Sequence, residues 1–305
     1  MTRAAPFFAL RFRVRPMLQL VLFNLTNGLI VGAFYVLMAL GLSLIINLSN
    51  VVNFAHGNFL AIGGYLAFTL TPYLGFWGAL LVSPFLTAIF GYIIEKVLIR
   101  HVYARNHIYS LLLTFGLGFI LKDACRFIWG PSPLPLGIPD ILSLPITPEL
   151  FFITWYRVFM VVVVIVAVGG LFAFLRYTRV GMRIRAGTLD LDTVSALGVN
   201  VAALRSYNFA VGSFLAGLAG VLAAGQIGLN PNMGDDLIMP SFIAIIVGGV
   251  GSLTGTLLGG LLIGVASALT TVVYPAGAEA VIYIIMALVL LIRPRGLLGE
   301  EGMLT

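Results

Sequence analysis

The chain has 305 residues, of which 60% are hydrophobic and only 9% are charged. Soluble domains carry about 25% charged residues, so this composition excludes a soluble globular protein. The formal net charge of +6 does not indicate nucleic-acid binding, because most basic residues lie in short loops between apolar runs, where they orient a membrane protein. The single cysteine excludes an intramolecular disulfide framework and a cysteine-rich metal site. We therefore expect an all-α polytopic membrane protein, with residues 1–305 forming one transmembrane domain.

The chain begins with a basic arm, residues 1–16, followed by an apolar run that has no small-residue cleavage site. This pattern predicts an uncleaved first span. Runs long enough to cross a bilayer, which takes about 20 residues, recur along the chain and predict about eight transmembrane helices. The apolar runs occupy residues 17–48, 54–74, 76–99, 108–128, 151–175, 206–228, 237–274 and 277–292.

The loops indicate an orientation. Residues 130–150 are proline-rich and contain no basic residue, which is typical of the outer side of the membrane. Residues 176–205 contain five arginines and are expected in the cytoplasm. The same is expected of the basic N-terminal arm, of the 95–107 loop with Lys96, Arg100 and Arg105, and of the C-terminal end with Arg293 and Arg295. We therefore expect both termini to be cytoplasmic.

Counting the crossings reveals a conflict in this orientation. Three apolar runs separate the N-terminal arm from residue 95, and three more separate residues 206 and 293, but an odd number of crossings cannot return to the same side. One run in each half is therefore expected to re-enter the membrane or to split, at NFAHG (53–57) and at VGGVGSLTGTLLGG (247–260). The alternative is that one arginine cluster departs from the positive-inside pattern.

Four polar residues lie within nine positions where the first two apolar runs meet: Asn50, Asn53, His56 and Asn58. Asn53 suits the N-cap of a helix that begins at Phe54. Non-helical backbone inside a membrane must lie against protein or a water-filled cavity, so this stretch predicts a helix break, either packed or beside a translocation path. Ionisable residues inside spans are rare and usually functional. His56 is thus either a hydrogen-bonded structural anchor or a residue of the path.

Small residues recur every four positions in the second half of the chain, which predicts closely packed helices but indicates no substrate. These residues are Gly212, Ala216, Gly220 and Ala224, and Gly251, Gly255 and Gly259.

One cytoplasmic segment has its own helical pattern. Asp190 can cap a helix, Leu191, Val194 and Leu197 are spaced for one face, and Gly198 can end it. The predicted helix has about seven residues and is too short to be stable alone, so it needs a surface to dock on. That surface is either the lipid headgroups or a cytoplasmic partner.

Several catalytic motifs are missing from the sequence. No GxxxxGK[ST] loop is present, so this chain cannot bind nucleotide phosphates in a P-loop. Neither HExxH nor GxSxG occurs, and the three histidines show no metal-ligand spacing. The sequence predicts a protein that is not an enzyme and has no catalytic residue, cofactor or metal.

Five segments, in this order, resemble the permease subunit of bacterial branched-chain amino acid importers of the ATP-binding cassette (ABC) class. Two permeases pair in such a system, and the form of the first segment resembles that of the shorter one. They are NFAHG, GMRIRAGTLDLDTVSALGVN, FLAGLAGVLAAG, IVGGVGSLTGTLLGGLLIG and RPRGLLG. The resemblance implies an ABC importer permease fold in the bacterial inner membrane. It also implies a second permease subunit, two cytoplasmic ATPase subunits, a periplasmic amino-acid-binding protein and an amino-acid substrate that crosses the lipid membrane.

On this resemblance, the segment at residues 190–198 is a coupling helix to the ATPase. Its residues are Asp190, Leu191, Asp192, Val194, Ala196, Leu197 and Gly198. Alternatives remain open at this point: a permease of the same family for urea or short-chain amides, or an ion-driven secondary transporter that would use His56, Asp123 or Glu279. A membrane scaffold without transport is a third class, against which the polar helix break argues.

Overall fold

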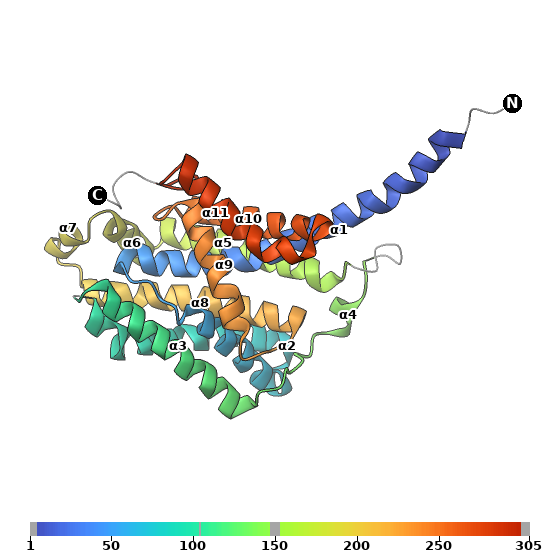
Figure 1. Ribbon diagram of the computed structural model, residues 1–305. Helices are drawn as coiled ribbons and strands as arrows, with labels where there is room; N and C mark the ends of the chain where they lie inside the picture. Colours follow the sequence, from blue (N-terminus) through green and yellow to red (C-terminus); the bar gives the residue numbers. More distant parts are fainter. Residues whose placement is uncertain (1–4, 104, 147–152, 300–305) are drawn as a thin grey trace.

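The computed structural model describes residues 5–103, 105–146 and 153–299 and is helical almost throughout (Figure 1). Residues 1–4 of the basic arm and 147–150 of the proline-rich loop lie outside the described residues. The helices are α1 (Ala5–Ser49), α2 (His56–Val97), α3 (His107–Trp129), α4 (Asp140–Ser143), α5 (Trp155–Tyr177), α6 (Arg179–Leu189), α7 (Leu191–Ala196), α8 (Val201–Ile227), α9 (Met233–Gly248), α10 (Leu253–Val273) and α11 (Ala278–Ile292).

Among the residues described, six helices are long and apolar enough to cross a membrane. They are Leu20–Ser49 of α1, α2, α5, α8, α10 and the Pro275–Ile292 segment that contains α11. The predicted all-α polytopic class is therefore confirmed. α3 is not among the six; it carries three charged residues in its second half, Lys122, Asp123 and Arg126.

α2 has 42 residues, about twice the length that a membrane span needs. Its helical geometry breaks at Gly75, which has φ +67°. Gly63 packs on Gly217 of α8, and Gly217 in turn packs on Thr87. Because Gly63 and Thr87 lie equally far along the chain from Gly75, the two arms of α2 (56–74 and 76–97) run antiparallel against the same level of α8. The two apolar runs predicted here thus correspond to a helical hairpin.

The predicted apolar run 237–274 is divided between α9 and α10. Gly249 and Gly251 have φ values of +106° and +95° and form the turn between the two helices. Beyond the turn, Gly248 packs against Gly255, and Gly259 lies against the carbonyl of Ala244, so the two helices run antiparallel. The chain therefore splits inside 247–260, and Gly251 lies in the turn and not on a helix face. α9, orange in Figure 1, crosses α1 and α8 at a steep angle.

α8 lies at the centre of the bundle, and its small residues allow backbones to approach closely. A Cβ added to Gly220 would lie 1.9 Å from the carbonyl oxygen of Leu60, and one added to Gly212 would lie 2.6 Å from that of Gly41. Ala216 and Ala224, on the same helix, are buried as well. The four-residue spacing thus places α8 against both α1 and α2.

α1 begins at one end of the bundle, and the residues described after α11 lie at the other (Figure 1). The last turn of α1 lies beside α6, where Leu48 contacts Gly187, whereas the Asn24 side chain accepts a hydrogen bond from Thr271 at the far end. After α11 the chain returns to the α6 end, where Gly296 packs on Gly249.

The expectation that both termini are cytoplasmic stays a prediction. α1 and the two arms of α2 run along the bundle three times before residue 98, in keeping with the odd count of apolar runs in the first half. This favours the alternative named above, in which one basic cluster departs from the positive-inside pattern.

Candidate functional site

The polar stretch between α1 and α2 turns back into the bundle. Asn50 has φ +52°, a left-handed conformation that asparagine tolerates, and its N–H donates to the carbonyl of Ile46 at the end of α1. Thr114 of α3 accepts a hydrogen bond from the N–H of Phe54 and donates one to the carbonyl of Val52. A side chain from another helix therefore satisfies the non-helical backbone, as a break at membrane depth requires.

Asn53 does not cap a helix that starts at Phe54, so that prediction is wrong. α2 begins at His56, and no side chain caps it. Residues 54 and 55 form a turn in which the main-chain carbonyl of Asn53, and not its side chain, accepts from the N–H of His56. The Asn53 side chain is fully buried, whereas Asn50 is exposed at the end of α1.

His56 is enclosed within the chain. Its Nε2 lies 3.0 Å from where a Cβ on Gly41 would be, and its ring meets Phe59 edge to face with centroids 6.3 Å apart. Gly41 is eight residues before the end of α1 (49 − 41), so α2 begins about 12 Å inside that end. In this conformation the imidazole packs between helices, and its place in a translocation path stays a prediction.

A cavity of about 240 Å³ lies where the start of α2 meets α3 and α9. Of the four polar residues predicted from the sequence, only Asn58 lines it. The lining residues are Phe54, Asn58, Phe115, Gly118, Phe119, Lys122, Asp235, Ile238 and Met239.

An ion pair forms part of the lining of this cavity. Lys122 of α3 and Asp235 in the first turn of α9 form a salt bridge with Nζ and Oδ2 2.7 Å apart. Close by, Arg126 donates a hydrogen bond of 3.0 Å to the side chain of Asn232. Sequence reasoning missed Lys122 and Asp235 because they come from distant segments. The available signal was a lysine inside an apolar run.

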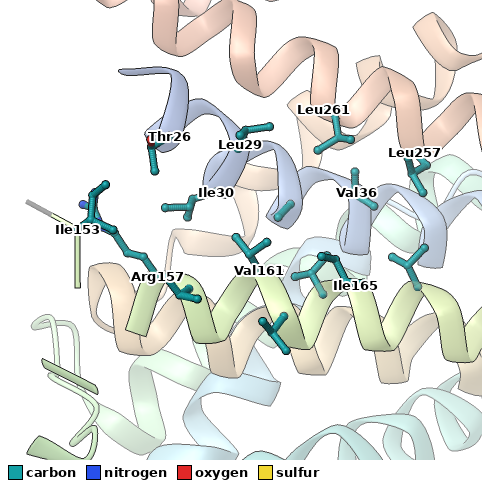
Figure 2. Close-up of a pocket in the computed structure, with 15 residues that line it drawn as sticks. Thr26, Leu29, Ile30, Val36, Ile153, Arg157, Val161, Ile165, Leu257 and Leu261 are labelled. Carbon is teal, nitrogen blue, oxygen red and sulfur yellow. The ribbon is translucent and has the colours of Figure 1, made fainter. Parts of the chain in front are cut away.

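A larger cavity, of about 530 Å³, lies between α1, α5 and α10. Figure 2 shows aliphatic side chains from these helices around it, including Ile30, Val161 and Leu261, with Arg157 at one end. Arg157 donates a hydrogen bond of 2.6 Å to Asn27. This surface suits apolar contacts and offers little to orient a polar solute.

The cytoplasmic segment forms the predicted short helix, α7. The Asp190 side chain accepts hydrogen bonds from the N–H groups of Asp192 and Thr193, at 3.1 and 3.0 Å. Hydrogen bonds from the side chain and then the backbone of Thr193 lower the pKa of Asp190, so the cap stays ionised at neutral pH. Gly198, with φ +82°, ends the helix in the conformation that glycine adopts readily.

The three apolar positions of α7 do not share one environment. Val194 is buried and Leu191 packs on Gly187 of α6, but Leu197 is 78% exposed. Asp192 and Ala196 are also exposed. The sequence did not predict α6, whose N-cap is Thr178. α7 packs on α6 and lies at one end of the molecule, where Leu197 is exposed (Figure 1).

A buried carboxylate near the same end also escaped the sequence reasoning. Glu95, at the end of the second arm of α2, is fully buried and accepts a hydrogen bond from Ser206 of α8. Arg100 lies 3.5 Å from the Glu95 carboxylate and donates a 2.7 Å hydrogen bond to Ser206. Burial, and then the nearby Glu95 carboxylate, raises the pKa of Tyr103. This cluster ties α2 and the loop after it to the first turns of α8.

Comparison with known proteins identifies the family. The permease protein BraD of the high-affinity branched-chain amino acid transport system of Pseudomonas aeruginosa is 32% identical over 299 residues, covering 91% of this chain and 95% of the relative. LivH of the corresponding Escherichia coli K12 system is 30% identical over 300 residues, covering 90% and 94%. The family model described as the permease component of the branched-chain amino acid transport system matches residues 24–292. The chain therefore belongs to the family of branched-chain amino acid transport system permeases.

Proposed function

We propose that this chain is the permease subunit of an ATP-driven importer that moves branched-chain or related hydrophobic amino acids from the periplasm to the cytoplasm. The relatives named above are permeases of branched-chain amino acid systems. The observation that carries ATP coupling is α7, a capped helix of six residues that exposes Leu197. Such a helix gains stability by burying that side chain in a partner.

The partners follow from what the chain lacks and what it exposes. The sequence has no P-loop, so hydrolysis belongs to separate subunits, two cytoplasmic ATPases on this proposal. A second permease subunit and a periplasmic amino-acid-binding protein complete the importer. α3 exposes Leu112, Phe115 and Phe119, an apolar face that a second permease would cover.

The α6–α7 end is assigned to the cytoplasmic side of the bacterial inner membrane. The arginines of residues 176–205 and those at 293 and 295 gather at this end, in keeping with the positive-inside rule. The start of α1 then lies on the periplasmic side. Movement of α7 would reach the polar junction through α6, because Gly187 contacts Leu48 just before that junction.

Uptake by the assembled transporter tests the proposal. The chain and its partners are reconstituted in proteoliposomes with internal ATP, and entry of labelled L-leucine is measured. We expect uptake to stop when the ATPase subunits carry a hydrolysis-dead substitution and to continue when a proton ionophore is added. Uptake that survives the dead ATPase but collapses with the ionophore would instead identify an ion-driven transporter.

A further inference from the structure

We infer that the 240 Å³ cavity between α2, α3 and α9 is this chain's half of a binding site for a zwitterionic aliphatic amino acid. Lys122 binds the substrate carboxylate and Asp235 its ammonium group. Asn58 accepts a further hydrogen bond from the ammonium group, and the aromatic wall holds the aliphatic side chain. This inference rests on the proposed function and adds a site to it.

The position of the ion pair indicates that this site faces water or a partner subunit and does not face lipid. Ionisable residues in membrane-spanning helices are costly against lipid and face protein or water. The outer part of α3 carries Lys122, Asp123 and Arg126, and the side chain of Asp123 is 72% exposed. Lys122 itself is mostly covered, with its Nζ 5.6 Å from the centroid of Phe119. The cavity therefore lies where a charged outer surface meets an apolar wall.

Asn58 provides independent support. This side chain is only 3% exposed and lines the cavity, yet its Oδ1 has no hydrogen-bond partner among the described residues. Leaving a buried acceptor unmatched is unfavourable, so a ligand that donates a hydrogen bond would satisfy it. The ammonium group of an amino acid is such a donor.

The walls select for an aliphatic side chain. Phe54 stacks on Phe242 with centroids 5.9 Å apart and meets Phe115 edge to face at 6.2 Å. Ile238 and Met239 complete the lining from α9. The volume lies just below the roughly 300–1,000 Å³ of complete ligand pockets, as expected for one half of a site that a second permease completes.

The charges of the cavity favour amino acids over the uncharged solutes that related permeases are expected to carry. A zwitterion can exchange the Lys122–Asp235 contact for two charge-assisted hydrogen bonds of its own. Urea and short-chain amides carry no formal charge and cannot replace the ion pair in this way. The competing explanation is that the pair only fastens α3 to α9.

Substrate protection of an introduced cysteine separates these explanations. In a Cys125→Ala background, Phe119→Cys places a thiol in the cavity wall, and Ile120→Cys places one at the next, 67% exposed position of α3 as a control. The assembled transporter is treated with a membrane-impermeant thiol reagent, with and without saturating L-leucine. We expect L-leucine to slow the labelling of Phe119→Cys about tenfold and to leave that of Ile120→Cys unchanged.

Charge-neutralising variants then test the ion pair. In the Phe119→Cys background, Lys122→Met and the double variant Lys122→Met/Asp235→Asn should raise the half-protecting concentration of L-leucine about tenfold, as for the loss of a charge-assisted hydrogen bond. The double variant leaves no unpaired charge between α3 and α9, so it keeps the test valid if the single variant assembles poorly.

The outcomes separate this inference from the proposed function. If L-leucine is imported but gives no protection, or protects the neutralised variants equally well, the cavity is not the substrate site, while the proposed function stands. If the assembled transporter imports urea but no branched-chain amino acid, both conclusions are wrong.

Discussion

At the scale of single residues, Glu95 shows how one buried charge can hold several segments together. Its carboxylate is inaccessible to solvent and is contacted by Ser206 from α8 and Arg100 from the loop after α2. Removing one member of a buried pair leaves the other charge without compensation, which costs about 3–5 kcal/mol when both are fully buried. Arg100 is one-third exposed, so water compensates part of this loss.

We therefore predict that Glu95→Ala destabilises the protein by about 1–3 kcal/mol, whereas Glu95→Gln, which keeps an acceptor for Ser206, has a smaller effect. Thermal unfolding of the purified protein in detergent measures the change. Lys96→Ala, at the exposed neighbouring position, is the control and should unfold like the unmodified chain. Equal midpoints for Glu95→Ala and Lys96→Ala would show that the cluster does not stabilise the fold.

At the scale of elements, α7 depends on signals at both of its ends. Asp190 supplies the cap that its free N–H groups need, and Gly198 ends the helix with a positive φ. Packing supplies the remaining stability through Val194, which leaves Leu197 exposed for a partner. The position of Leu197 thus depends on both the local turn and the support from α6.

Gly198→Val should weaken binding of the ATPase without preventing membrane insertion, because a β-branched residue is strained at positive φ. Gly137→Val is a matched control: neither glycine has an atom within 4 Å of an added Cβ, and only Gly198 has a positive φ. Co-purification of the ATPase with each variant measures the effect. Undiminished recovery with Gly198→Val would count against α7 as the docking element.

At the scale of the whole molecule, the start of α1 and the end of α11 lie at opposite ends of the bundle (Figure 1). α1 contacts the rest of the bundle near both of its ends. Leu48 contacts Gly187 at one end, and Asn24 accepts a hydrogen bond from Thr271 at the other. A buried helix with such contacts cannot be reversed without breaking its packing against α8 and α10, so we expect this packing, and not the charges of the basic arm, to decide the topology.

Short epitope tags at the two termini test this topology. In spheroplasts, we expect an antibody to bind the N-terminal tag and to reach the C-terminal tag only after permeabilisation. Tyr73→Cys at the exposed turn of the α2 hairpin and Leu189→Cys at the end of α6, each in a Cys125→Ala background, serve as reference positions for the two sides. Two tags that are accessible from the same side would contradict the single crossing of α1.

Much of the architecture was predictable because its causes are local. Apolar run length indicated the membrane class, the glycines of 247–260 indicated the split between α9 and α10, and Asp190 and Gly198 marked the ends of α7. Each of these signals acts between residues a few positions apart. The predicted cap at Asn53 failed for a tertiary reason: hydrogen bonds with Thr114 hold residues 52–54 in a non-helical conformation, so the helix begins later.

By itself, the sequence determined the membrane class, most of the helical segments and the polar break at residues 50–58. Only the tertiary structure decided which polar residues meet. Lys122 pairs with Asp235 and Glu95 with Ser206, and their positions differ by 113 and 111 residues along the chain. His56 likewise packs against Gly41, and of the four polar residues of this stretch only Asn58 lines the cavity. Such pairings depend on which faces of the helices contact one another. The close approach of the α1 and α2 backbones to the glycines of α8 determines these faces.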